Sequence, residues 1–337
     1  MGRIPADYLV NRLVTLFLTV LIAATLIWII PRLSGLDPAS AALGRMAAGG
    51  GSVANADEIL AQLRSSFGLD QPLLVQYLLY VKNTLTLDFG LSTASFPTPV
   101  AAMIGGALPW TIGLMLISLI ITFIIGNLLG ALMVWEHTPR LWKAAIPAAM
   151  VFTSIPPILS GLLLMYVFST QLRWLPLSGP YGLNVEPGWT LDFASSVLYH
   201  GFLPAMSIVV VTFGFWALGM RGLMITVQGE DYTTLAKAKG LRPRYILYRY
   251  MIRNAILPQI TAFALKIGML VAGQVLVERI FAYPGMGKLL YDAILTQDYP
   301  VIQGVSFVII LMTALAVFFV DLVYPFIDPR IRHGAGA

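Results

Sequence analysis

Six long runs of apolar residues divide the chain, and polar or charged residues gather between them. The runs cover residues 13–30, 108–135, 142–170, 198–220, 255–277 and 301–327. A helix needs about 20 apolar residues to cross the hydrocarbon core of a bilayer. The runs lack the alternating pattern of barrel strands, and a backbone in lipid must satisfy its own hydrogen bonds. Each run therefore predicts a transmembrane helix.

The composition agrees with a polytopic membrane protein. Of the 337 residues, 58% are apolar and 11% are charged, and the mean hydropathy is +0.81. A water-soluble domain is less apolar than this. The chain contains no cysteine, which excludes disulfides, thiolate metal sites and thiol catalysis. The first apolar run lacks a small-residue cleavage site followed by a soluble domain, so we expect a retained span.

Charge is distributed unevenly over the segments that connect the runs. The segments on the side of both termini hold 13 Lys and Arg against five Asp and Glu, a net of 13 − 5 = +8. The segments on the other side hold seven bases and ten acids, a net of 7 − 10 = −3. Since Lys and Arg favour the cytoplasmic side, both termini are predicted to be cytoplasmic. The same distribution explains the basic pI of about 9.4 without a nucleic-acid partner.

These patterns predict four parts of the chain. They are an N-terminal transmembrane helix (1–31), an external segment (32–107), a five-helix core (108–327) with a cytoplasmic loop at 221–254, and a cytoplasmic tail (328–337). The external segment contains the linker Gly49–Ser52, an amphipathic helix at 57–67 that ends at Gly68, and a small external subdomain at 71–85. The chain shows no internal repeat.

The basic stretch from Asp231 to Pro258 carries the signals of two short helices. Asp231 suits the start of the first helix, because acidic residues are stabilised at a helix N-terminus. Gly240 suits the left-handed position that closes it, and Pro243 suits the first turn of the second helix. Pro258 would kink the entry into the fifth span. Two interpretations stay open, an amphipathic segment on anionic lipid and a docking surface for another protein.

This loop resembles the cytoplasmic coupling loop of ABC-importer permeases, the binding-protein-dependent inner-membrane components. That family has Glu-Ala-Ala, three residues and Gly; here Ala236 and Gly240 fit the pattern. The departures from it resemble the dipeptide/oligopeptide/nickel subfamily. The matching residues are Asp231-Tyr232, Ala236-Lys237-Ala238-Lys239-Gly240-Leu241, Arg253-Asn254-Ala255 and Pro258.

The resemblance extends over nearly the whole chain. From Glu278 to Gly287 the sequence is similar to the subfamily pattern Glu-x-x-Phe-x-x-Pro-Gly-x-Gly. The segment Gly68-Leu69-Asp70-Gln71-Pro72 is similar to the first permease of such pairs. The Gly49–Ser52 insertion is not part of the pattern.

The resemblance implies an all-α membrane protein with the type I ABC importer permease fold, in the bacterial cytoplasmic (inner) membrane. It also implies a sister permease in a heterodimer, two cytoplasmic ATPases and an extracytoplasmic substrate-binding protein. ATP and Mg would belong to the ATPases, because the Gly287-Lys288 pair is followed by Leu289 rather than Ser or Thr. Di- or oligopeptides are the expected substrates, with oligosaccharides, opines and nickel as alternatives within the family.

The resemblance and the residue chemistry together name three groups of candidate residues. Those expected to dock an ATPase are Asp231, Tyr232, Leu235, Ala236, Ala238, Lys239, Gly240, Arg242 and Arg244. Those expected along the translocation path are Lys266 and Gln274. Those expected to contact the binding protein are Glu278, Tyr283, Asp292 and Asp298.

Lys266 and Asp321 are ionisable residues within predicted spans, where a charge is a functional candidate by default. Lys266 stands where the subfamily more often has a neutral polar residue. It could line the path and attract a carboxylate, pair with Asp321, or snorkel. Asp321, near the inner end of the sixth span, is expected to be structural. Gln274 could line the path or make a hydrogen bond between helices.

Other classes of protein fit this chain less well. An ion-gradient-driven secondary transporter should show broken spans, repeats and several buried acids. That class, like a membrane scaffold, leaves the elaborate loop unexplained. His137, His200 and His333 are scattered and hydrolase motifs are absent, so we expect a transport subunit without metal site or enzymatic activity.

Overall fold

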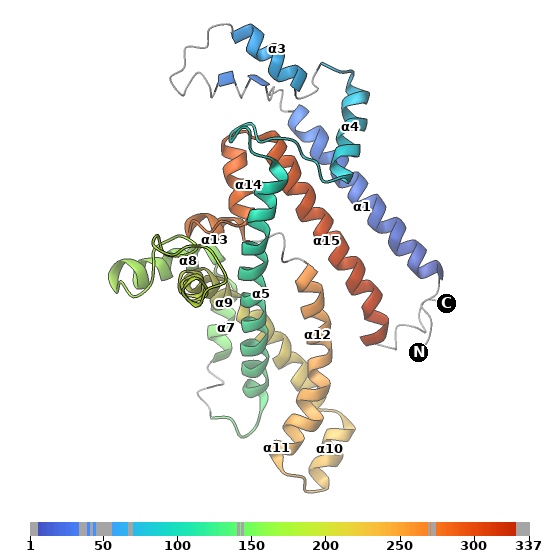
Figure 1. The fold of residues 1–337 in the computed structure, drawn as a ribbon. Helices are drawn as coiled ribbons and strands as arrows, with labels where there is room; N and C mark the ends of the chain where they lie inside the picture. The colour runs from blue at the N-terminus through green and yellow to red at the C-terminus, as the bar shows by residue number, and fades with distance from the viewer. Residues whose placement is uncertain are drawn as a thin grey trace. The chain divides into compact units, whose positions relative to one another are not determined.

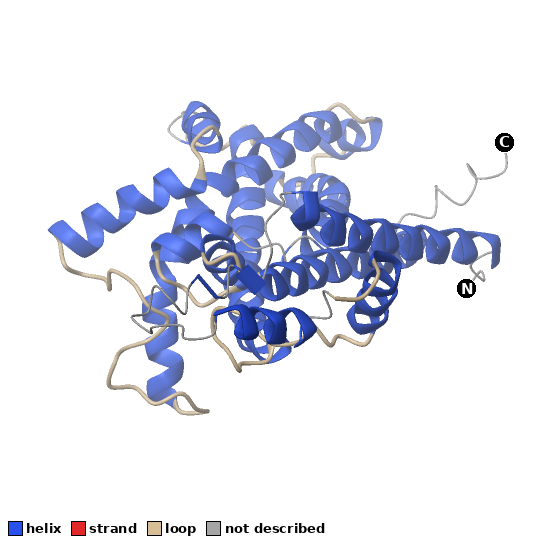
Figure 2. Cartoon of the chain, turned by 90° about the horizontal axis from the view of Figure 1, so that it is seen from above, coloured by secondary structure: helices blue, strands red, loops and turns tan. Residues whose placement is uncertain are grey.

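The computed structural model describes residues 6–33, 39–40, 43–44, 56–66, 70–139, 142, 145–268, 270 and 274–327. Within these ranges the chain is helical, with one isolated β-bridge between Leu91 and Pro99 and no strand (Figures 1 and 2). The all-α prediction is confirmed for this part of the chain. The Gly49–Ser52 insertion, Gly68 and the tail at 328–337 lie outside it.

Four described helices are long and apolar enough to cross a membrane. They are α1 (Ala6–Leu33), α5 (Val100–Val134), α9 (Leu191–Gln228) and α15 (Tyr299–Ile327). Their apolar windows match the first, second, fourth and sixth predicted runs. A bent helix pair raises the number of candidate spans to five if it is taken as one span.

The third predicted run is this bent pair. It contains α7 (Ala145–Thr153), then α8 (Pro157–Leu164), which continues into the π-helical segment η1 (Met165–Gln171). The direction of the chain changes by 102° between the two parts. Pro156 and Pro157 donate no backbone hydrogen bond, and Pro157 opens α8 in its first turn. The two prolines therefore produce a sharp break, and both parts pack against α9.

The fifth predicted run is not one continuous helix in the described residues. Its first part is α12 (Arg253–Gly268), and its end lies in α13 (Val275–Ile280). Residues 269 and 271–273, between them, lie outside the description. α12 is not among the four described helices that are long and apolar enough to cross a membrane.

The chain divides into two compact units, which we describe separately. The first contains Met1–Thr111, Val271–Val275 and Pro284–Leu322. Its helices are α1, α3 (Ala56–Ser66), α4 (Leu73–Leu85), the start of α5, α14 (Met286–Leu295) and α15 up to Leu322. The helix α3 confirms the helix predicted at 57–67, and α4 lies in the segment predicted as a small subdomain at 71–85.

The first unit is held together by an apolar cluster and a buried carboxylate. The cluster comprises Val100, Ile104, Ala107, Met286, Ala293, Val301, Val305 and Val308. Asp298, at the start of α15, accepts hydrogen bonds from the Ser92 hydroxyl (2.5 Å) and from the backbone N–H groups of Thr93 (3.1 Å) and Ala94 (3.0 Å). Its carboxylate thus fixes the loop that precedes α5.

The second unit contains Ile112–Leu270, Leu276–Tyr283 and Val323–Ala337. Here α5 and α9 approach closely because α5 carries glycines where they meet. A Cβ built on Gly126 would lie 2.6 Å from the carbonyl oxygen of Phe213, and one on Gly130 would lie 2.8 Å from Cβ of Met220. Small residues permit such approach between helices in membranes.

Candidate functional site in the loop between α9 and α12

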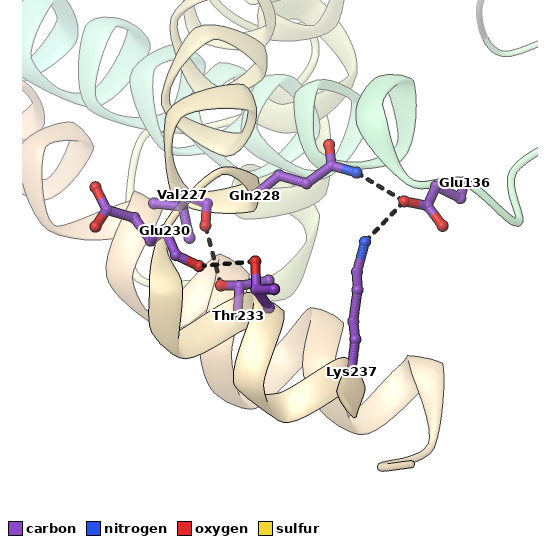
Figure 3. A network of polar contacts seen from close by, with 7 residues as sticks. Glu136, Val227, Gln228, Glu230, Thr233 and Lys237 are labelled. Carbon is purple, nitrogen blue, oxygen red and sulfur yellow. Dashed lines mark hydrogen bonds and ion pairs between the residues drawn. The ribbon is translucent and has the colours of Figure 1, made fainter. Parts of the chain in front are cut away.

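The loop begins with the helix α10 (Asp231–Ala238), which is tied back to the end of α9. The backbone N–H groups of Thr233 and Thr234 donate to the carbonyl of Glu230, at 3.0 and 3.2 Å. The buried Thr233 hydroxyl donates to the carbonyl of Val227 at 3.0 Å (Figure 3). These contacts start α10 at Asp231, directly after Glu230, as the sequence predicted for Asp231.

A Schellman motif ends α10. Gly240 has φ of +68°, the left-handed conformation that favours glycine. Its N–H donates to the carbonyl of Lys237 (2.9 Å), and the N–H of Leu241 donates to the carbonyl of Ala236 (3.3 Å). The predicted left-handed conformation of Gly240 is confirmed, and it turns the chain into the next helix.

The second predicted helix begins at Pro243, as expected, and runs on into α12. It starts as α11 (Pro243–Ile246) and continues as the π-helical segment η2 (Leu247–Ile252). Leu247 and Arg253, where the segments join, keep right-handed helical dihedrals. Pro258 lies within α12. A movement of the loop is therefore linked to α12 through helical backbone (Figure 1).

One face of α10 packs into the chain's own core. The core cluster beneath the loop comprises Ala131, Met220, Met224, Ala236, Ile246, Leu247, Met251 and Ala255. Ala236 is 2% exposed. We expected Ala236 to contact a partner; its burial among methionine and aliphatic side chains corrects that expectation, because it supports α10 from beneath.

The opposite face of α10 and the turn after it are exposed. We call this the docking face; it comprises Asp231, Tyr232, Leu235, Ala238, Lys239, Gly240, Arg242 and Arg244. Leu235 is 56% exposed although it is apolar. Sequence reasoning missed the exposed Tyr245 and Tyr248, which the spacing of three residues on the second helix could have indicated. Exposed aromatic and aliphatic side chains beside arginines are typical of protein interfaces.

Glu136, in the turn after α5, holds α10 from the side. Its Oε1 accepts hydrogen bonds from Nζ of Lys237 (2.9 Å) and Nε2 of Gln228 (2.8 Å), as Figure 3 shows. The hydrogen bond and the charge of Lys237 lower the pKa of Glu136. A cavity of about 220 Å³ adjoins these side chains and is also lined by Trp135, His137, Leu241 and Met251. Sequence reasoning missed Glu136, because it lies 101 positions from Lys237.

The two ionisable residues predicted to lie within spans have different surroundings. In the first unit, the Asp321 carboxylate pairs with Arg12 at 2.9 Å, and its backbone carbonyl accepts a hydrogen bond from the Tyr8 hydroxyl. In the second unit, Nζ of Lys266 lies 5.3 Å from the centre of the Phe215 ring. Among the described ion pairs, Asp321 therefore has Arg12 as its partner. Gln274 is half-buried and immediately precedes α13.

Three of the four residues expected to contact a binding protein are buried. Glu278 is 0% exposed, and its carbonyl accepts a hydrogen bond from the N–H of Tyr283. Burial, with the nearby charge of Glu278, raises the pKa of Tyr283 to about 12. Asp298 is 2% exposed and satisfied by the loop at 92–94. This burial corrects the expectation for these three side chains.

Asp292 is the partly exposed residue of these four, and it pairs with Lys288 one turn away at 2.6 Å. The described residues hold no group of three or more His, Cys, Asp or Glu that could bind a metal ion.

Comparison with known proteins identifies the family. A model described as "Binding-protein-dependent transport system inner membrane component" matches residues 126–333, which include the whole loop. A probable peptide ABC transporter permease protein, y4tP, of Sinorhizobium fredii is 32% identical over 328 residues, 97% of this chain and 99% of that one.

Two further relatives are similar over most of their length. The glutathione transport system permease protein GsiC of Salmonella typhimurium is 33% identical over 330 residues, 97% of this chain and 99% of that one. The oligopeptide transport system permease protein AppB of Bacillus subtilis is 33% identical over 272 residues, 81% of this chain and 84% of that one. The chain therefore belongs to the family of binding-protein-dependent transport system inner membrane components, as a multi-pass ABC importer permease of the bacterial inner membrane and a transport subunit rather than an enzyme.

Proposed function

We propose that this chain imports short peptides as half of a permease heterodimer, driven by two cytoplasmic ATPases and supplied by an external substrate-binding protein. Its relatives support the substrate class, because they are named as peptide, oligopeptide and glutathione permeases. ATP and Mg would be bound by the ATPases.

One observation carries this proposal, the docking face of α10. The helix is fixed on its inner face by Thr233 and Ala236 and exposes Leu235 and Tyr232 on the other. A segment that only rests on anionic lipid would have no need for the acids Glu230 and Asp231 at its start, since anionic headgroups repel them. An ATPase groove would cover the apolar side chains and pair with the flanking Arg242 and Arg244.

We propose a topology of six spans with both termini in the cytoplasm. The charge difference between the two sets of connecting segments supports this orientation. The third span would be discontinuous, since it breaks at Pro156. Irregular backbone at membrane depth is tolerated where it is buried in protein or lines a water-filled cavity. Residues 32–107 would then be external and 221–254 cytoplasmic.

The coupling step follows from how α10 is built. ATP binding would close the ATPase pair and move the docking face. The Thr233 and Glu136 contacts tie α10 to the ends of α9 and α5. The Schellman motif turns the chain from α10 into α11, and η2 links α11 to α12. To shift the permease from 1:99 to 99:1 between two states, ATP must favour one state by about 5.5 kcal/mol.

The remaining candidate residues receive narrower roles. Lys266 and Gln274 stay candidates for the translocation path. Asp292 stays a candidate for contact with the binding protein because it is partly exposed. Glu278, Tyr283 and Asp298 would hold the surface that the binding protein contacts, and Asp321 would fix α1 through Arg12.

The docking face can be tested with Leu235→Glu in the tagged, assembled transporter. We expect normal amounts of the chain in the membrane, because Leu235 is exposed, but loss of most co-purifying ATPase and of ATP-dependent peptide uptake. The matched control is Leu85→Glu, the same change on an exposed leucine at the end of α4. Full ATPase recovery with the Leu235 variant would rule out docking at this face. ATP-independent uptake by the wild type would favour an ion-gradient-driven carrier.

A further inference from the structure

Lys266 stands beside a group of aromatic side chains contributed by three helices of the second unit. We call it the aromatic cluster; it comprises Phe123 of α5, Phe215 and Trp216 of α9, and Phe263 of α12. Ring centres are separated by 4.5 Å for Phe123 and Phe263, and by 5.3 Å for Phe215 and Trp216. Trp216 is buried, while Phe215, which lies next to the Lys266 ammonium, is exposed.

The position of Lys266 makes its charge expensive in lipid. It lies 13 positions after Arg253 on α12, which is about 20 Å along a helix. On the proposed topology this places the ammonium deep in the bilayer, beyond reach of the inner headgroups. A lysine at a helix centre costs about 2.5–3.5 kcal/mol in lipid, so such residues face protein or a water-filled cavity.

No carboxylate of the described chain pairs with Lys266. Its ammonium lies over the face of Phe215, with Nζ 5.3 Å from the ring centre. Asp321, the acid that could have neutralised it from within a span, already pairs with Arg12. The Lys266 side chain is exposed in the isolated chain. Its ammonium group is therefore accessible from outside this chain.

A second polar group close to the aromatic cluster also has unused capacity. Asn127 lies one turn beyond Phe123 on α5, and its Nδ2 donates to the carbonyl of Phe123 at 2.7 Å. Its Oδ1 is buried and has no hydrogen-bond partner within the described residues. Buried acceptors are usually satisfied, so this oxygen has capacity for one further hydrogen bond.

From these contacts we propose that Lys266 binds the carboxylate of the substrate as it passes, with the exposed face of Phe215 covering an adjacent apolar group. The inference rests on the proposed peptide import and deepens it, because the permease itself would then favour peptides with a free C-terminal carboxylate. A hydrogen bond to a charged group contributes more than a neutral one, and a substrate without the carboxylate would leave the ammonium unpaired.

The test uses the complete transporter in proteoliposomes with two probes, trialanine and trialanine C-terminal amide. Uptake of each is measured for the wild type, Lys266→Met, Lys266→Arg and the control Lys82→Met, which makes the same change on exposed α4. All variants use the same binding protein at saturating concentration, so its own preference cancels when acid-to-amide uptake ratios are compared. Stimulation of ATP hydrolysis by the loaded binding protein reports whether each complex is assembled.

We expect Lys266→Met to lower the acid-to-amide ratio by about tenfold, the factor that corresponds to losing one charge-assisted hydrogen bond. Lys266→Arg and Lys82→Met should keep the wild-type ratio. An unchanged ratio in Lys266→Met, or an equal loss of both probes, would overturn the inference and leave a structural lysine. If the wild type itself took up neither probe, the peptide assignment would fail first, and the inference with it.

Discussion

The loop between α9 and α12 and the segment that leads from α13 into α15 both carry charged residues between apolar stretches, but they use them differently. On α10 and in the turn that follows it, Asp231, Lys239 and two arginines remain exposed around Leu235. In the other segment, Glu278 and Asp298 are buried and contact their own chain. The first region has the properties of a surface that binds a partner, whereas the buried charges of the second stabilise the fold of their own chain.

The difference lies in what surrounds each charge. Asp298 is followed by a helix and faces a loop whose Ser92 hydroxyl and two N–H groups need an acceptor. A buried carboxylate that accepts several such bonds is stabilised in place. In the first turn of α10, the N–H groups of Thr233 and Thr234 donate to the backbone carbonyl of Glu230. They therefore do not need the Asp231 carboxylate as an acceptor. A charged side chain in a short connection therefore stays exposed only if no nearby backbone group needs it as a hydrogen-bond partner.

Asp298→Leu should have the largest effect of the substitutions that test whether the two regions differ in this way. The buried Ser92 hydroxyl and the partly buried N–H groups of Thr93 and Ala94 lose their acceptor. A buried donor left unpaired costs about 1–3 kcal/mol, so we expect a clear loss of stability and less chain in the membrane. Thermal unfolding of the purified complex in detergent measures it. Asp298→Asn, which keeps one acceptor oxygen, should be intermediate.

The control for this experiment is Asp292→Asn, which breaks a partly exposed pair with Lys288. It should change stability by no more than about 1 kcal/mol. If Asp298→Leu left stability unchanged but abolished the response to the binding protein, Asp298 would return to the group of partner contacts.

Gly240→Val should have the next largest effect, on coupling rather than on insertion. A Cβ at Gly240 meets nothing within 4 Å, so the cost comes from its φ of +68°. An L-residue in the left-handed region costs roughly 1–2 kcal/mol, and reorienting α10 instead would disconnect the docking face. We expect ATP hydrolysis to continue while peptide uptake falls roughly tenfold.

The matched variant is Gly229→Ala, at the end of α9. Gly229 has φ of −81°, which alanine adopts without strain. Uptake by this variant should match the wild type. Normal uptake by Gly240→Val as well would show that the angle set by Gly240 is not needed for coupling.

Glu136→Gln should have the smallest effect. Exposed ion pairs contribute about 0.2–1 kcal/mol, so peptide imported per ATP should fall less than fivefold. The double variant Glu136→Lys, Lys237→Glu should restore it. Because Lys237 lowers the pKa of Glu136, the pair is present above that pKa and lost only as pH falls through it. Coupling should thus not vary with this pair between about pH 5 and 8.

Local signals in the sequence predicted much of the loop. Gly240 and Pro243 stand where the helices end and begin, because each residue has a backbone preference that does not depend on distant contacts. The apolar runs predicted α1, α5, α9 and α15 because length and composition decide whether a helix can cross a bilayer. Length and composition gave the third run as one span, whereas the structure bends it by 102° at its two prolines.

The sequence by itself determined the class of the protein, the helices, the start and end of α10, and the basic loop that resembles a coupling element. Those properties follow from composition and from neighbours along the chain. Only the tertiary structure decided which face of α10 is exposed, that Glu136 reaches Lys237, that Asp321 pairs with Arg12, and that Asp298 is buried. Each of these depends on side chains far apart in the sequence, whose approach no local preference specifies.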